Sequence, residues 1–501
     1  MDILGFLSNM DYSSLFSLVF VIFLGLFVGM LMGAIPGLGL MIAVTLLLPL
    51  SYSLSPLESI LLLLACYQGA EYGGSISAIT MGIPGTVMAS ATLLDGYPMA
   101  QSHSPGKALA YSLTASTIGG LFGAFVLIFL SKPLTAFAIN LGDPEYFLLA
   151  LIGLVAVSTI GSDDKLKNFV SIILGLLAGT IGVDIFSGTP RFTAGISALY
   201  DGVNLIMLVV ALFAITEVFF MISDDDLHQR RKIDAMNMKI KLTFTEFRKV
   251  IKQIFSGSIL GSTIGIIPGL GSSASSWFGY IAAKKLSKKP NEFGKGNPEG
   301  IVGPESANNA TVGGALLPLL TLGIPGSASL AIIAGAFIIH GIQPGPQLFS
   351  NNTELVNGIF IGFVFTSIGM FLMGKVLTSA FARVVVTPNS YLVPAILIFS
   401  LIGVYVSTTN YTDLWLALIL GVIAYYLRRF NYSVYSFVLA FVLSPIMEVG
   451  LRRALDISGG SYAIFFSRPY SLLLIGILLI IIISTIAKSI MNYRKNMRTS
   501  A

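Results

Sequence analysis

Four Pro-Gly pairs interrupt apolar runs of the chain, and small or hydroxyl residues follow them. Proline lacks a backbone N–H and clashes with the preceding turn, and glycine lowers helix propensity, so each pair predicts a broken helix. A helix that restarts after the break directs free N–H groups and a positive dipole end at the gap, which suits an anion. The predicted substrate-binding residues are Pro36, Gly37, Gly39, Pro84, Gly85, Thr86, Ser90, Pro268, Gly269, Gly271, Ser272, Ser273, Pro325, Gly326 and Ser327.

Small residues also let membrane helices pack closely, and for a single break this would be the preferred explanation. The breaks here form two matched pairs. Residues 33–39 read GAIPGLG and residues 265–271 read GIIPGLG, and GIPG occurs at 82–85 and again at 323–326. Paired interruptions at corresponding places of two halves favour a central binding site.

A polar cluster precedes each GIPG motif. Ionisable residues inside apolar segments are costly and usually functional. We therefore predict that Glu71 or Glu305 carries a coupling proton, or that Asn308, Asn309 and freed carbonyls bind a cation such as sodium. For Glu305 a loop position is an equally good interpretation, because residues 299–303 are not apolar.

Three other polar residues are not expected to have a functional role. Asp95 and Glu217 lie at apparent helix ends, where we expect them to be solvated, and His340 is expected to be a polar residue at the end of an apolar run. The only cysteine, Cys66, excludes a disulfide framework. No catalytic motif is present, so the sequence predicts no enzyme, no cofactor and no metal beyond a candidate sodium ion near Asn308 and Asn309.

The elements that position these residues are predicted to be membrane helices. Of the 501 residues, 55% are hydrophobic and 11% are charged, against roughly 25% charged in soluble proteins. Apolar runs long enough to span a bilayer recur along the chain, and they predict an all-α polytopic membrane protein with about 10–13 membrane segments, some broken or re-entrant. The first run has no basic residue before it and is predicted to be a retained helix.

The matched motifs divide the chain into repeats. We predict a first transmembrane repeat at 1–221, a basic cytoplasmic linker at 222–253, a second repeat at 254–470, and a C-terminal helix with a basic tail at 471–501. The segment 284–296 carries five lysines, whereas its counterpart 51–58 has none. Equivalent loops of opposite charge bias predict inverted topology, and a parallel duplication with drifting loops is the alternative.

The motifs resemble the large membrane subunit of the tripartite tricarboxylate transporters, the TctA family. The resemblance rests on GAIPGLG (33–39), YQGAEYGGSISAITMGIPG (67–85), LLDGYPMAQ (93–101), GIIPGLGSSASS (265–276), PESANNA (304–310) and the run at 321–349. It covers about residues 15–470 and supports the core site at the Pro-Gly motifs, Asn308 and Asn309. Glu71 departs from the pattern, since the family implies an apolar residue there.

The resemblance implies a permease subunit of a secondary active importer for carboxylates such as citrate, in the cytoplasmic (inner) membrane. It implies two partners, a small membrane subunit and an extracytoplasmic solute-binding protein, with coupling to a sodium or proton gradient. A passive anion channel and a non-transporting membrane scaffold are the alternatives. A nucleic-acid partner is not expected, because membrane topology explains the net charge of +5. Arg191 is a hypothetical docking or gating residue.

Overall fold

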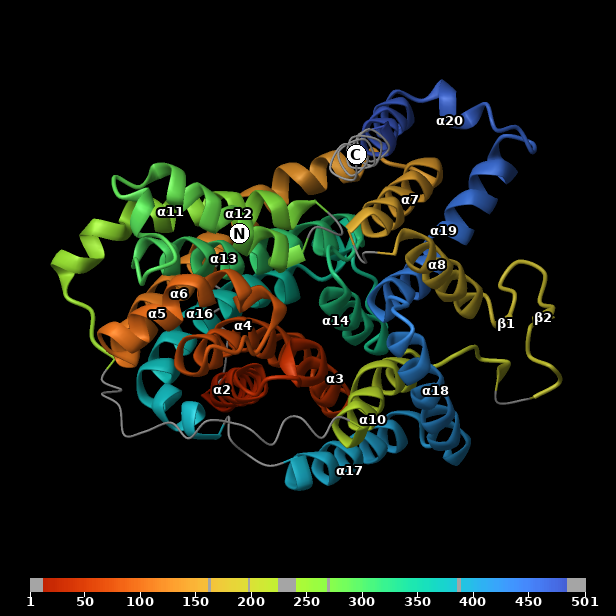
Figure 1. Ribbon diagram of the computed structural model, residues 1–501. Helices are drawn as coiled ribbons and strands as arrows, with labels where there is room; N and C mark the ends of the chain where they lie inside the picture. Colours follow the sequence, from red (N-terminus) through yellow and green to blue (C-terminus); the bar gives the residue numbers. More distant parts are fainter. Residues whose placement is uncertain are drawn as a thin grey trace, which may run out of the picture. The chain divides into compact units, whose positions relative to one another are not determined.

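The computed structural model describes residues 12–160, 164–196, 199–223, 240–267, 271–384 and 389–483. These residues are almost entirely helical, which confirms the predicted all-α class (Figure 1). Their only strands are β1 (Gly182–Val183) and β2 (Pro190–Arg191), an antiparallel pair with Gly182 opposite Arg191 and Val183 opposite Pro190.

Contacts within the chain define two compact units, and each unit draws on both sequence repeats. Unit 1 comprises residues 1–135 and 204–426, and unit 2 comprises residues 136–203 and 427–501. The predicted repeat boundaries do not coincide with these units, and they stay a prediction about the sequence.

The first-repeat helices of unit 1 are α2 (Tyr12–Ala34), α3 (Gly39–Ser51), α4 (Pro56–Met81), η1 (Val87–Ala89), α5 (Ser90–Ser102), α6 (Pro105–Ala138), and the continuous α9 (Leu205–Val209), η3 (Val210–Ile215) and α10 (Thr216–Ser223). Its second-repeat helices are α11 (Phe244–Ile266), α12 (Gly271–Leu286), η5 (Pro290–Glu292), α13 (Glu299–Leu322), α14 (Ala328–Ile339), α15 (Pro346–Asn351), α16 (Thr353–Val384), α17 (Asn389–Thr408) and α18 (Tyr411–Arg429). Unit 2 contains α7 (Asp143–Ile160), α8 (Lys165–Gly179), α19 (Val434–Ile457) and α20 (Ile464–Ser467).

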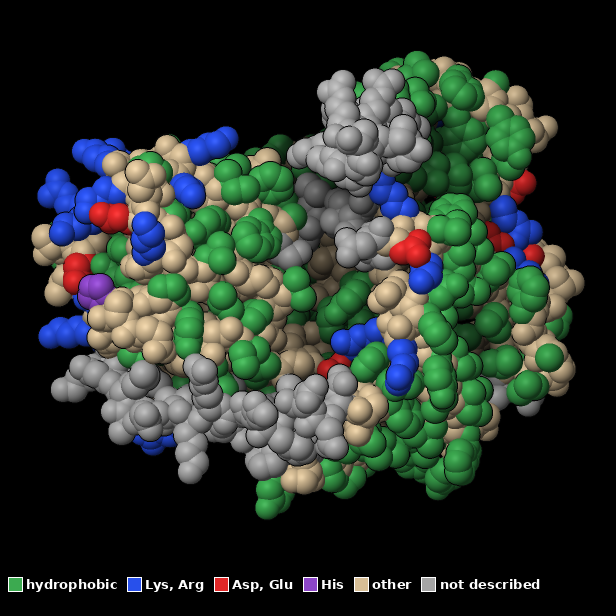
Figure 2. Space-filling view, in the orientation of Figure 1, with side chains coloured by type: hydrophobic (Ala, Val, Ile, Leu, Met, Phe, Trp, Pro, Cys, Tyr) green, Lys and Arg blue, Asp and Glu red, His purple; other side chains and the backbone are tan. Residues whose placement is uncertain are grey.

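Seven helices of the described chain are long and apolar enough to cross a membrane. They are Ser13–Ala34, Pro105–Ala138, Leu205–Ser223, Thr353–Arg383, Ser390–Thr408, Tyr411–Arg429 and Val434–Ile457. Three shorter apolar helices accompany them, and hydrophobic side chains cover much of the visible surface (Figure 2). The polytopic membrane class is therefore confirmed, whereas the total of 10–13 segments stays a prediction.

Glycines hold the first and third helices of each half together. Gly25, Gly29 and Gly33 of α2 pack against the backbone of α4, where an added Cβ at Gly33 would lie 2.8 Å from the Ala70 Cα. In the second half, Gly257, Gly261 and Gly265 of α11 pack in the same way against α13. Each set repeats every four residues, so its members share one helix face and allow close backbone approach.

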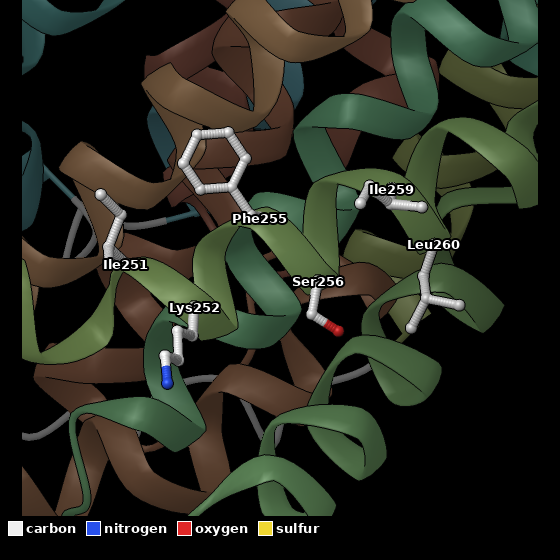
Figure 3. Close-up of a pocket in the computed structure, with 6 residues that line it drawn as sticks. All are labelled: Ile251, Lys252, Phe255, Ser256, Ile259 and Leu260. Carbon is white, nitrogen blue, oxygen red and sulfur yellow. The ribbon is translucent and has the colours of Figure 1, made fainter.

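The opposite face of α11 is apolar and open. Ile251, Phe255, Ile259 and Leu260, with Lys252 and Ser256, line a hollow of about 670 Å³ on this face (Figure 3). Phe255 and Ile259 are about half exposed, at 47% and 53%. A face of this composition suits contact with lipid rather than water.

Helix α11 begins at Phe244, within the segment predicted as linker. Thr243 and Glu246 form a capping box there, and the Lys107 ammonium pairs with Glu246 at 2.5 Å. The Lys107 ammonium and the Thr243 groups lower the pKa of Glu246 to about 2. Basic residues made this first turn read as a loop, although its capping residues specify a helix start.

Helices α4 and α13 run antiparallel where they cross. Ser75 bonds to Glu305, and the Asn308 amide donates to the Glu71 carbonyl at 3.4 Å, so the numbering rises along one helix as it falls along the other. These helices follow the matched motifs of the two halves. Their orientation is compatible with inverted topology, which stays a prediction.

Candidate substrate and ion site

The predicted helix breaks coincide with observed helix ends. Helix α2 ends at Ala34, two residues before Pro36 of the first motif, α4 ends before the first GIPG, and α13 ends before the second. Gly82 and Gly323 close α4 and α13 with left-handed backbone, at φ 71° and 74°, a conformation that glycine adopts without strain. Between α11 and α12, Pro268 and Gly269 lie outside the described residues.

The two breaks of each half abut one another. A Cβ at Gly85 would overlap the Gly33 carbonyl oxygen, and one at Gly326 would lie 3.2 Å from the Gly265 carbonyl oxygen. Gly33 and Gly265 are the first residues of the two GxxPGLG motifs. Each half thus brings its two motifs together at one place, as their pairing in the sequence suggested.

The breaks of opposite halves also meet. Segment η1 contacts α12, and α14 contacts α3, where the Ser329 hydroxyl lies 3.0 Å from the Met41 sulfur. The Tyr67 hydroxyl of α4 lies 3.3 Å from the Ser272 hydroxyl of α12. Helix ends of both halves therefore converge inside unit 1.

The hydroxyls that follow the breaks differ in their partners. Ser327 is the N-cap of α14 and accepts from the Leu330 N–H at 3.3 Å, as predicted for a restarting helix. Thr86 precedes η1 but its buried hydroxyl has no hydrogen-bond partner in the described chain. Ser90 and Gly271 begin α5 and α12. The Ser273 side chain lies outside the description.

Glu305 is a buried member of helix α13, so the loop interpretation is wrong. Its Oε1 accepts from Ser75 and, at 2.5 Å, from Thr92; its Oε2 accepts from Ser112 at 3.0 Å and from Ser116 at 2.7 Å. The lack of apolar character at residues 299–303 made this helix start look like a loop. Four hydroxyls from α4, α5 and α6 solvate one carboxylate of the other half.

Glu71 has the opposite environment. It is fully buried in α4, and neither carboxylate oxygen has a hydrogen-bond donor in the described chain. The Ser272 hydroxyl and the Asn308 amide are its polar neighbours. Burial of an unpaired carboxylate costs free energy, so Glu71 is expected either to bind a ligand or to be protonated.

Asn308 and Asn309 lie beside these carboxylates. The Asn308 Nδ2 donates to the Glu71 carbonyl and the Asn309 Nδ2 donates to the Glu305 carbonyl, each at 3.4 Å. Their Oδ1 atoms are buried and have no donor in the described chain. The four predicted ion-coupling residues therefore lie at one crossing of α4 and α13, where Asn308 and Asn309 are one helical turn after Glu305.

Asp95 is completely buried, which corrects the expectation that it is solvated. Its Oδ1 accepts from the backbone N–H groups of Gly294, Gly296 and Asn297 at 2.7–2.9 Å, and its Oδ2 accepts from Tyr280 at 2.9 Å. Glu217 is only 7% exposed, so it is not solvated either. His340 does end α14. Sequence spacing alone gave no signal that α5 binds the 292–297 loop.

Replacing Asp95 with Ala is expected to release the loop after α12. The three N–H groups would lose their acceptor, which costs about 2–4 kcal/mol of stability because bonds to a charged group are strong. Trypsin should then cut the purified protein faster after Lys288 and Lys295, because Pro290 blocks cleavage after Lys289. Glu292→Ala in the same loop is the control, because its pair with Lys289 is surface-exposed and contributes little. Unchanged cleavage of Asp95→Ala would contradict this role.

Arg191 of unit 2 is engaged within its own unit. Its two terminal nitrogens bond to the Glu448 carboxylate at 2.6 and 3.2 Å. Arg452 joins the same carboxylate at 2.9 Å and Asp184 at 2.8 Å. This network anchors the β1–β2 hairpin to α19. The docking or gating role remains a hypothesis.

Sequence reasoning missed the hydroxyls that surround Glu305. Ser112 and Ser116 are four residues apart within the apolar helix α6, so they share a face, and this spacing was a usable signal. Ser75 lies close to a recognised motif, and Thr92 follows Pro84-Gly85, where its hydroxyl is expected to cap a restarting helix rather than to bond to Glu305.

Seven helices long and apolar enough to cross a membrane, together with broken helices whose ends gather buried polar groups, define a multi-pass membrane transport protein. The chain belongs to the tripartite tricarboxylate transporter TctA family, whose model matches residues 19–439. The membership gives it the permease role of a tripartite transport system. The predicted family is thereby confirmed.

Two relatives come from Agrobacterium vitis. An uncharacterized 52.8 kDa protein of the TAR-I ttuC' 3'region is 35% identical over 463 residues, which cover 92% of each chain. An uncharacterized protein of the TAR-II ttuC' 3'region is 38% identical over 234 residues, which cover 47% of this chain and 97% of that one. No solved structure matches the chain significantly.

Proposed function

We propose that this chain is the permease subunit of a secondary active importer for organic carboxylates in the cytoplasmic (inner) membrane. The observation that carries the proposal is the convergence of the helix breaks of both halves. None of the four motifs contains Lys or Arg. An anion held there would be bound by backbone N–H groups and hydroxyls at restarting helices.

The family points to the rest of the system. An extracytoplasmic solute-binding protein delivers the carboxylate, and a small membrane subunit completes the tripartite assembly. A sodium or proton gradient drives uptake, because the ion binds one conformation better than the other and so shifts their populations. Buried acid at Glu71 beside the breaks disfavours substrates with many carboxylates, so the proposal names the carboxylate class rather than citrate.

Uptake of radiolabelled carboxylates into proteoliposomes tests this function. The liposomes contain this chain with the small subunit and a cognate binding protein, under an imposed sodium or proton gradient. We expect uphill uptake that requires the binding protein and is abolished by Gly326→Leu, because the new side chain would fill the space between Gly326 and the Gly265 carbonyl.

Two other results would count against the proposal. Flux that only follows the substrate gradient would indicate a channel. Absence of any flux, with the binding protein bound and the wild-type chain folded, would indicate a scaffold. Full activity of Gly326→Leu would leave the carrier standing but would reject the broken helices as its site.

A further inference from the structure

We propose that Glu71 and Asn308 hold a monovalent metal cation, of which sodium is the probe. Both side chains are at least 99% buried, at 0% and 1% exposure. The two Glu71 carboxylate oxygens and the Asn308 Oδ1 have no hydrogen-bond donor in the described chain. The contact of the Asn308 amide with the Glu71 carbonyl brings the two residues together.

The chemistry of the unpaired atoms favours a metal ion over a proton. All are oxygen acceptors, and the Asn309 Oδ1 adds another on the adjacent residue. A proton bonded to one oxygen satisfies at most one further acceptor. A hard cation binds several carboxylate, amide and hydroxyl oxygens at once, which matches the unpaired Glu71 and Asn308 oxygens beside the Ser272 and Tyr67 hydroxyls.

The charge of the cluster favours a single positive charge. Glu71 supplies one negative charge, whereas Asn308, Tyr67 and Ser272 are neutral. Divalent sites gather more carboxylates than this. Glu305 is the other buried acid nearby. Both of its carboxylate oxygens already accept hydrogen bonds, from four hydroxyls in total, so a cation is not required to stabilise it. The two acids therefore have different roles: Glu305 fastens the halves together, and Glu71 binds the ion.

The position of the cation relates it to the substrate. Ser272 lies in the first turn of α12, and the Tyr67 hydroxyl is near both Ser272 and the α14 cap Ser327. A cation at Glu71 would thus stand beside the helix ends that are proposed to hold a carboxylate. It would offset the repulsion between Glu71 and that anion. This coupling rests on the proposed function, but cation binding itself does not.

Direct binding of sodium to the purified full chain, without substrate, tests the inference. Radioactive sodium is titrated against the detergent-solubilised protein, with choline chloride keeping the ionic strength constant. We expect one saturable site per chain in the wild type and at least tenfold weaker binding in both Glu71→Gln and Asn308→Ala. Glu58→Gln, which removes the same charge from the first turn of α4, should bind like the wild type.

Thermal unfolding separates lost binding from lost folding. Sodium should raise the melting temperature of the wild type and of Glu58→Gln, but not that of Glu71→Gln, when compared with choline. Absence of sodium binding by the wild type would overturn the inference, as would binding that survives both site substitutions. Proton-driven uptake without sodium binding would also overturn it while leaving the proposed permease function intact. Sodium binding without any uptake would support the cation site but contradict the proposed permease function.

Discussion

Gly85→Ala is expected to lose most carboxylate uptake, whereas Gly326→Ala, at the matched position of the other half, should retain a substantial part of it. A Cβ at Gly85 would meet the Gly33 carbonyl, the Ser77 hydroxyl at 2.6 Å and the Gly74 Cα at 3.1 Å. At Gly326 its nearest neighbours, including the Ala315 Cβ, lie at 3.2–3.3 Å. Only the second set of neighbours can relax by a few tenths of an ångström.

The difference follows from how far the neighbouring atoms must move. Backbone atoms are among the neighbours at both glycines, but at Gly85 they belong to the packed helices α2 and α4 and lie closer than at Gly326, so the methyl group would separate the two breaks of the first half. Overpacking of this kind costs about 1–3 kcal/mol and more where backbone must shift. The expected uptake of Gly85→Ala is therefore roughly a tenth of wild type or less, if the cost falls on the transport-competent state.

Proteoliposome uptake at matched protein content measures both variants. Gly476→Ala is the control, because an added Cβ there has no neighbour within 4 Å. Equal activity of Gly85→Ala and the control would show that close contact between the breaks is unnecessary. Equal loss in Gly85→Ala and Gly326→Ala would show that the two halves do not differ as their packing indicates.

Glu305→Ala is expected to destabilise the folded protein more than any other single substitution near the site. It would leave the hydroxyls of Ser75, Thr92, Ser112 and Ser116 without their common acceptor, in a region sealed from water. Loss of one partner from a buried charged network costs about 3–5 kcal/mol. Because the four hydroxyls belong to three helices of the first half, the loss should loosen the contact between the halves.

Thermal unfolding in detergent, followed by size-exclusion chromatography at each temperature, measures this effect. Ser116→Ala removes one of the four donors, and its cost of about 1–2 kcal/mol should be clearly smaller. The Glu71→Gln variant is the second comparison, because its carboxylate makes no hydrogen bond in the described chain. A Glu305→Ala protein as stable as the wild type would refute the role assigned to the four hydroxyls.

The positions of the helix breaks were readable from the sequence because they are local properties. Pro36, Pro84 and Pro325 are each followed by glycine, and this pair opposes a helix more strongly than a lone proline such as Pro304, which lies inside α13. The structure ends helices α2, α4 and α13 just before the three pairs. The membrane class was readable for a similar reason, since low charge and long apolar runs leave no soluble alternative. The repeated motifs also identified the family, which the match over residues 19–439 confirms.

Only the tertiary structure decided what each buried acid does. Glu71 and Glu305 are the same residue type, and each belongs to a polar cluster before a GIPG motif, so the sequence made both candidates for ion coupling. The donors that separate them are far away in the chain: Ser75 precedes Glu305 by 230 residues and Ser116 precedes it by 189. No local sequence pattern indicates whether such a distant hydroxyl will bond to a given carboxylate. Asp95 could not be interpreted from the sequence for the same reason. The backbone N–H groups that bind its carboxylate lie 199 to 202 residues later in the chain. The helix breaks follow from Pro-Gly pairs that are adjacent in the sequence. The role of a buried carboxylate instead depends on the groups that folding brings next to it.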